Sequence, residues 1–184
     1  MSGFEAALLG VIQGLTEFLP VSSSAHLILA REVFGWDAGA LGLAFDVSCH
    51  VGTLIAVLLF FRHDVVAMLV ALPAALRGSR DNHAGIVRSI VIGTTPVLFA
   101  GLLFSDFVTS TLRTPEVVVV ALVLGSVAML VSERVSSGNR AGVVLTGFEA
   151  FGIGLVQAAA LIPGVSRAGA VIVMAMLFGV RRDS

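Results

Sequence analysis

Three long apolar stretches limit what this chain can fold into. They cover residues 41–61, 87–105 and 115–132, and each contains a single Asp, Glu or Arg. A helix that crosses the hydrocarbon core of a bilayer needs about 20 mostly apolar residues. The chain is therefore predicted to span a membrane several times. A fourth stretch, 169–180, is long enough to span only if its helix begins near Ser166.

The composition excludes the main alternatives to a membrane protein. Hydrophobic residues make up 57% of the chain and charged residues 12%, whereas soluble domains average about 25% charged residues. Disorder requires low hydrophobicity, and a disulfide scaffold requires more than the single Cys49. Because the net charge is −1 and no basic run exists, we expect no nucleic-acid partner.

Two further apolar segments, 4–30 and 142–168, are interrupted by polar residues, proline and glycine. Each follows one plan: an apolar helix containing glutamine, a proline, a small polar turn and a second apolar helix. This pattern is typical of broken or re-entrant helices that line a cavity at membrane depth. The run GVIQ at 10–13 parallels GLVQ at 154–157, and a Pro and a Val-Ser pair follow each run, with one residue inserted.

Arginines in the connecting segments predict how these segments enter the membrane. Segment 62–88 holds four arginines and 133–140 holds two, whereas 106–114 holds only Arg113. Cytoplasmic loops are the arginine-rich ones, so the two interrupted segments would enter from opposite faces. We therefore expect an all-α polytopic membrane protein with one integral membrane domain. Its parts are a first re-entrant motif and following helix (1–35), transmembrane helices (41–132), and a second motif and helix (142–181).

The first interrupted segment carries a cluster of polar residues: Gln13, Glu17, Ser22, Ser23, Ser24 and His26. Gln13 and Glu17 are four residues apart, so they share one helix face. An ionisable side chain inside a membrane segment is by default a candidate functional residue. The alternative is structural: Glu17 and His26 at the membrane interface, and the serines as helix caps. A capped helix N-terminus also binds anions, so capping and ligand binding are compatible.

The second cluster is PGVSRAG at 163–169. The planar guanidinium of Arg167 suits phosphate oxygens, and Gly164 and Gly169 allow the backbone to approach a ligand closely. The alternative is that Arg167 extends to the lipid headgroups. If the two clusters converge, they form a phosphate-handling site. Asp46 and His50, four apart in a predicted span, fit either a role near that site or a polar pair satisfied within the bundle.

These motifs resemble those of a known family. GVIQGLTEFLPVSSSAHLI at 10–28 closely resembles the first signature of the bacitracin-resistance family of undecaprenyl-diphosphate phosphatases, and PGVSRAGA at 163–170 resembles the second. FDVSCHVGTLIAVLLFFR at 45–62 is similar to the family helix between them. The resemblance implies an inverted repeat with two re-entrant helix pairs. It also implies a multi-pass inner-membrane hydrolase that converts undecaprenyl diphosphate to undecaprenyl phosphate and inorganic phosphate, recycling the lipid carrier of cell-wall synthesis and conferring bacitracin resistance.

Matching positions imply roles for single residues. Glu17 matches the essential acidic position, and Gln13 a position that is Glu or Gln; together they are expected to hold a divalent cation, Mg²⁺ or Ca²⁺. His26 matches the histidine proposed as nucleophile or acid–base group, and Ser23 and Arg167 complete the expected catalytic set. The expected substrate-binding residues are Ser22, Ser24, Gly164, Ser166 and Gly169. Ala168 stands where the family usually has serine.

Family members continue beyond the position of Ser184 with further transmembrane helices. The resemblance therefore implies that about the last third, and with it part of the second repeat, lies outside this sequence. The expected partner is a polyprenyl diphosphate within a lipid membrane, and a homodimer is left open. Two rival functions are also left open: a polyprenyl-phosphate flippase or transporter, since inverted repeats with broken helices are typical of transporters, and an inactive truncated fragment.

Overall fold

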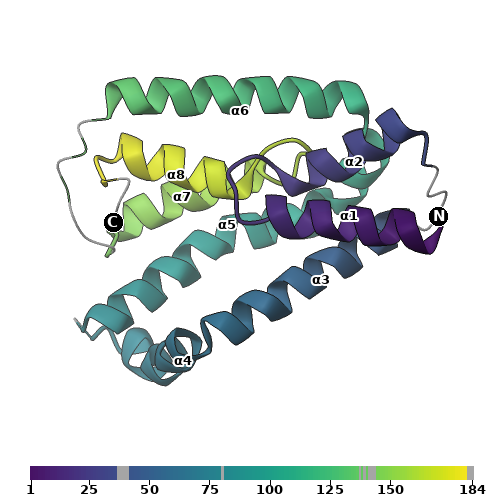
Figure 1. Cartoon of the computed structure of the whole chain (residues 1–184). Coiled ribbons are helices and arrows are strands. Elements are labelled where there is room, and N and C mark those ends of the chain that lie inside the picture. Colours follow the sequence, from purple (N-terminus) through teal and green to yellow (C-terminus); the bar gives the residue numbers. More distant parts are fainter. Residues whose placement is uncertain (37–41, 80, 137, 139, 141–143, 182–184) are drawn as a thin grey trace.

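The computed structural model describes residues 1–36, 42–79, 81–136, 138, 140 and 144–181. Within these residues the chain forms helices and no β-strand (Figure 1). The helices are α1 (Gly3–Thr16), α2 (Ser23–Phe34), α3 (Gly42–Phe60), α4 (Arg62–Leu76), α5 (Asn82–Thr111), α6 (Pro115–Val135), α7 (Gly147–Ala159) and α8 (Arg167–Leu177). The predicted all-α class is confirmed.

Among the described residues, three helices are long and apolar enough to cross a membrane. They are α3, α5 and α6, with mean hydropathies of 2.0, 1.8 and 2.2, and they cover the three predicted spans. Their outward side chains are largely apolar and exposed; Leu102 and Leu103, for example, are 71% and 73% exposed. Such a surface suits lipid rather than water. Helix α8 does begin beside Ser166, but its 11 residues are too few to cross a bilayer.

The segment 62–88 is not the connecting loop that its arginines predicted. Most of it is helical, because α4 occupies Arg62–Leu76 and α5 begins at Asn82. Helix α4 packs against the start of α5 through a small core of Ala75, Ala84 and Val87, with Met68, Ala71 and Ala74 around it. The apolar residues between the arginines therefore form a short helix whose packing stabilises it.

The first and last helix pairs are related by an internal repeat. Helix α7 begins at Gly147 and α1 at Gly3; α8 begins at Arg167 and α2 at Ser23, so both starts are 144 residues apart. GFEA opens α1 and α7 alike, and a capping box precedes each, formed by Ser2 with Glu5 and by Thr146 with Glu149. Aligned on helix starts, the repeat is longer than GVIQ alone indicated and needs no insertion.

The two pairs point toward each other. Figure 1 shows α1 and α7 entering from opposite ends of the molecule, so that the α1–α2 and α7–α8 turns both lie near its middle. Helix α7 lies very close to α5 at Gly154, where a Cβ would be 2.4 Å from the carbonyl oxygen of Gly93. Only glycine permits this approach, which fixes the second pair against the longest helix.

A buried carboxylate ties the first pair to the spans. Asp46 on α3 is 3% exposed, and it accepts hydrogen bonds from Nη2 of Arg31 on α2 and Nη2 of Arg113 after α5, both at 2.5 Å. The Arg31 guanidinium also lies over the ring of Phe45, 5.8 Å from its centroid. Asp46 is therefore a satisfied polar group within the bundle, paired with arginines rather than with the side chain of His50.

The N-terminus of α7 provides a pH-dependent contribution to stability. Glu149 accepts hydrogen bonds from Arg140 and from the backbone and hydroxyl of Thr146. The Arg140 hydrogen bond, opposed by burial, lowers the pKa of Glu149 to about 2. A lowered pKa stabilises the fold fully above the unfolded value of about 4.3, and this stability is lost as the pH falls through the folded value.

We therefore expect the melting temperature of wild type in detergent to exceed that of Glu149→Gln at pH 6, and this difference to shrink between about pH 4.3 and pH 2. The matched control is Glu5→Gln, which removes the charge at the same capping-box position in α1, where the described contacts of Glu5 are to Ser2. A wild-type advantage over Glu149→Gln that stays constant down to pH 2 would contradict the ion pair's role.

Candidate functional site

The turn between α1 and α2 is unusual in its backbone. Ser22, the residue before α2, has φ 62° and ψ 94° and is the one described non-glycine residue with a positive φ. Its side chain makes no capping bond to α2 and instead lies 3.3 Å from the Ser24 hydroxyl. A residue held in such a rare conformation costs about 1–3 kcal/mol and typically marks a functional site.

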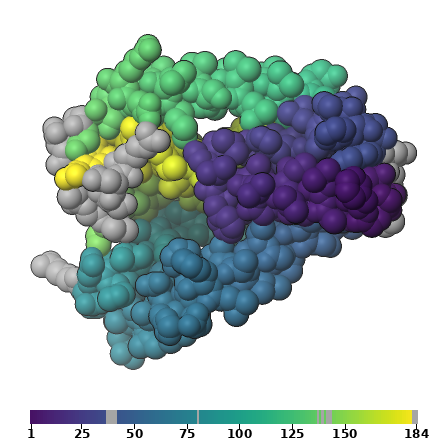
Figure 2. All heavy atoms as spheres, in the orientation of Figure 1, coloured from purple at the N-terminus to yellow at the C-terminus, as the bar shows by residue number. Residues whose placement is uncertain are grey.

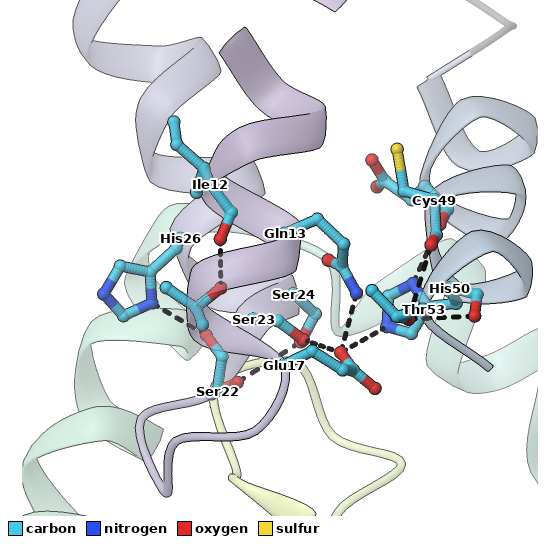
Figure 3. Close-up of polar contacts among 12 residues, drawn as sticks. Ile12, Gln13, Glu17, Ser22, Ser23, Ser24, His26, Cys49, His50 and Thr53 are labelled. Atoms are coloured by element: carbon cyan, nitrogen blue, oxygen red, sulfur yellow. Dashed lines mark hydrogen bonds and ion pairs between the residues drawn. The ribbon is translucent and has the colours of Figure 1, made fainter. Parts of the chain in front are cut away.

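Glu17 is the centre of the polar cluster at this turn (Figure 3). Its Oε2 accepts hydrogen bonds from Gln13 Nε2 and from the Ser23 hydroxyl, both at 2.6 Å. Nε2 of His50, on α3, lies 3.7 Å from the same oxygen. Gln13 and Glu17 thus share a helix face as predicted. Glu17 is part-buried, with its side chain 27% exposed, and it is hydrogen-bonded to the side chains of Gln13 and Ser23.

The turn between α7 and α8 is built around two glycines. Gly164 has φ +102°, and a Cβ there would be 2.7 Å from the Val118 carbonyl oxygen on α6. Gly169 packs close to Pro20 and Ser166. The Ser166 hydroxyl accepts from the Gly169 N–H at 3.1 Å, so Ser166 caps α8. Gly164 is therefore needed for the packing of this turn on α6, whereas a Cβ at Gly169 would make a tight contact of 3.2 Å with the Ser166 Cβ.

The two turns converge on one cavity of about 430 Å³. Its lining includes Glu17 and all three serines of the first turn, together with Ser166, Arg167 and Ala168 of the second. His50 and Gln157 complete its polar wall. Gly164 and Gly169 do not line it. The cavity brings together the carboxylate, several hydroxyls and the guanidinium of the two motifs, but not the predicted histidine, His26.

Arg167 is positioned to bind an anion in this cavity. It is exposed and is the first residue of α8, where helix N–H groups favour negative charge. Within the described residues its guanidinium has no hydrogen-bond or ion-pair partner, unlike Arg31, Arg113 and Arg140. Its five donors are therefore free for a ligand.

His26 does not join the residues around Glu17. Its Nδ1 lies 2.9 Å from the Ser22 carbonyl oxygen, which places the ring on the other side of the turn (Figure 3). There it lines a second cavity of about 1210 Å³, beside α6 and α8. Gly164 and Gly169 also line this second cavity, and Figure 2 shows a hollow between α6 and the first helix pair.

Two lining residues were not among the predicted site residues. His50 was predicted, together with Asp46, to have either a role near the site or a satisfied polar contact within the bundle, and nothing in the sequence placed α3 beside the first turn. Gln157 occupies the repeat position of Gln13, 144 residues later, and that equivalence was the available signal. Both lie in the smaller cavity.

Comparisons with known proteins show the family to which this chain belongs. The family model described as "Bacitracin resistance protein BacA" matches residues 6–184. The chain is 45% identical over 182 residues to the undecaprenyl-diphosphatase of Rubrobacter xylanophilus, covering 97% of this chain and 67% of that protein. It is 41% identical to the enzyme of that name from Saccharophagus degradans and 40% identical to that of Idiomarina loihiensis, covering 100% of this chain and 68% and 69% of those proteins. The chain belongs to the bacitracin resistance protein BacA family.

Proposed function

We propose that this chain hydrolyses undecaprenyl diphosphate to undecaprenyl phosphate and inorganic phosphate at the inner membrane. The observation that carries the proposal is the cavity where Glu17, three serines and the free guanidinium of Arg167 meet. Relatives at 40–45% identity bear the name undecaprenyl-diphosphatase. The reaction regenerates the lipid carrier for cell-wall synthesis and thereby confers bacitracin resistance.

In this proposal the diphosphate binds between the two turns. Arg167 forms charge-assisted hydrogen bonds to phosphate oxygens, and these are roughly twice as strong as neutral ones. The N-terminus of α8 adds its partial positive charge, and Ser22, Ser24 and Ser166 supply further hydrogen bonds. Because phosphoryl transfer depends mainly on positioning and charge stabilisation, this set of donors accounts for much of the rate.

The prenyl chain extends into the larger cavity. The two cavities are adjacent, because Val165 and Ser166 line both, and a lipid whose head is in the smaller one would pass beside these two residues to reach the larger one. The wall of the larger cavity is mostly apolar and includes Val120 and Leu124 of α6 and Val173 of α8. Such a wall suits a hydrocarbon chain.

A divalent cation fits the donors around Glu17. In the described residues, no group of three or more His, Cys, Asp or Glu side chains lies close enough together to hold a metal ion. Mg²⁺, however, commonly uses one or two carboxylates together with substrate phosphates. Oε1 of Gln13 is buried and has no hydrogen-bond partner. Rotation of the amide by half a turn exchanges this oxygen with Nε2 and brings it beside Glu17. A bound cation supplies neutralising charge to the phosphate oxygens.

Ser23 and Glu17 are arranged for proton transfer. The Ser23 hydroxyl donates to Glu17 at 2.6 Å, so the carboxylate can accept its proton as the oxygen, or a water that it orients, attacks the terminal phosphorus. The bond from that phosphorus to the bridging oxygen breaks, and undecaprenyl phosphate leaves. Attack by water gives inorganic phosphate directly, whereas attack by the Ser23 oxygen gives a phosphoserine that a second step, attack by water on its phosphorus, converts to inorganic phosphate and free serine. A direct chemical role for His26 requires its ring to leave the Ser22 carbonyl and cross the turn.

The test is phosphate release by the purified chain in detergent from a C15 or C55 prenyl diphosphate. We expect release with Mg²⁺ or Ca²⁺, loss of release with EDTA, and recovery when the cation is returned. Lipid translocation in vesicles without phosphate release would overturn the proposal in favour of a transporter. Folded protein that neither releases phosphate nor moves lipid would show that these residues do not suffice for activity.

A further inference from the structure

We propose that His50 is a ligand of the cation at Glu17, giving this site an imidazole nitrogen in addition to its oxygens. The proposal rests on the proposed function, since it places the cation at Glu17. Neither family motif contains His50, and it reaches the site from a different helix, α3. Three features of its surroundings support ligation: the hydrogen bond of its other nitrogen, its distance from Glu17 and the fixing of its helix.

The first feature is the hydrogen bond of the second ring nitrogen. Nδ1 of His50 lies 2.8 Å from the carbonyl oxygen of Asp46. A carbonyl oxygen only accepts, so Nδ1 carries the hydrogen and the neutral ring has its lone pair on Nε2. Histidines that bind metals usually donate their other N–H to a carbonyl or carboxylate in this way. The nitrogen left free by this bond is the one that faces Glu17.

The second feature is the separation of the two facing atoms. Nε2 of His50 and Oε2 of Glu17 are 3.7 Å apart, which is too long for a hydrogen bond. In the neutral ring both atoms are acceptors, and they have no hydrogen to share. A cation held at about 2.1 Å from each ligand fits between two atoms at this separation. Figure 3 shows His50 and Glu17 facing each other beside Gln13.

The third feature is the fixing of α3. Asp46 lies one helical turn before His50 and is held by Arg31 and Arg113. Helix α3 also packs against α1, which carries Gln13. The imidazole is therefore attached to a segment whose position is set by buried ion pairs. Precise placement of this kind is what a metal ligand requires.

His26 provides the internal comparison. Its Nδ1 bonds to the carbonyl of Ser22, four residues earlier, just as His50 bonds to that of Asp46. Its ring, however, lines the larger cavity, and it forms no ion pair with a carboxylate in the described part of the chain. The two histidines thus have the same tautomer and different surroundings. Only His50 has a carboxylate beside its free nitrogen.

The experiment uses Mn²⁺ as the probe, bound to the purified chain in detergent without substrate. Electron spin-echo envelope modulation detects ¹⁴N coupling when an imidazole nitrogen coordinates Mn²⁺. We expect this coupling in wild type and in His26→Gln, and its absence in His50→Gln. We also expect His50→Gln to weaken Mn²⁺ binding by about 10-fold or more, and Ca²⁺ binding less, because Ca²⁺ prefers oxygen ligands.

Two results would overturn the proposal: no nitrogen coupling in wild type, or coupling that persists in His50→Gln, including the case in which it disappears in His26→Gln alone. The first needs no variant, so a folding defect cannot obscure it. Phosphate release, measured in parallel, separates this proposal from the proposed function. Cation-dependent phosphate release without nitrogen coupling would exclude His50 as a ligand and leave the phosphatase assignment standing. Nitrogen coupling without phosphate release would support His50 as a ligand and contradict the phosphatase assignment.

Discussion

Replacing Arg167 with alanine is expected to reduce kcat/KM for phosphate release from a prenyl diphosphate by about 10³-fold. Arg167 is the free guanidinium in the cavity, so its loss leaves the developing charge on the phosphate oxygens without its strongest donor. Arg167→Lys retains the charge but loses the bidentate hydrogen-bonding geometry, and we expect its activity to lie between those of wild type and Arg167→Ala. The measurement is the initial rate of phosphate release across substrate concentrations.

The matched control is Arg134→Ala. Arg134 is an exposed arginine in the last turn of α6 and lines neither cavity, so its removal changes the net charge by the same amount. We expect activity near that of wild type. If Arg167→Ala retains most of the wild-type rate, the second turn does not handle the diphosphate and the assignment of the cavity is wrong.

Replacing Asp46 with alanine is expected to lower the free energy of unfolding by about 3–5 kcal/mol. The substitution leaves the guanidinium groups of Arg31 and Arg113, whose side chains are 12% and 23% exposed, without their shared carboxylate. An uncompensated buried charge is far more costly than the loss of a surface ion pair. The measurement is a denaturant titration in mixed micelles, followed by circular dichroism.

Asp106→Ala is the control for this effect. Asp106 is an exposed residue on α5, and surface substitutions usually change stability by about 0.5 kcal/mol or less. We expect the Asp46 variant to unfold at a clearly lower denaturant concentration than the Asp106 variant. Equal stabilities of the two variants would show that the arginine pair around Asp46 contributes nothing to holding α2, α3 and the α5–α6 turn together.

The apolar spans could be predicted from the sequence because hydropathy and length alone define them. The spans at 41–61, 87–105 and 115–132 correspond to α3, α5 and α6. Helix α4 was not predicted, because the arginine content of 62–88 is typical of a connecting loop. Its helical state depends on packing against α5, which the sequence pattern does not show. The full repeat was also not predicted. An alignment of Pro20 with Pro163 needs an inserted residue, whereas an alignment of the helix starts and of the shared GFEA gives a constant spacing of 144 residues.

The part of the candidate site that the sequence predicted is the part in which both interacting residues lie on one helix. Gln13 and Glu17 lie one turn apart, so helical periodicity alone brings them together. His26 lies across the turn from Glu17, with Nδ1 against the carbonyl oxygen of Ser22, whose φ is positive; no local sequence pattern indicates such a backbone. The approach of His50 to Glu17 depends on tertiary packing of α3 against α1, which periodicity within one helix cannot predict.

The central claim is that two turns, 144 residues apart in the repeat, form one diphosphate site. It is tested most directly by a double-mutant cycle on the binding of a non-hydrolysable prenyl methylenediphosphonate, with Ser23→Ala in the first turn and Arg167→Ala in the second. If both residues contact one ligand, their effects on binding free energy should be coupled by about 0.5 kcal/mol or more. Effects that add to within about 0.3 kcal/mol would mean that the turns act separately and would contradict the account.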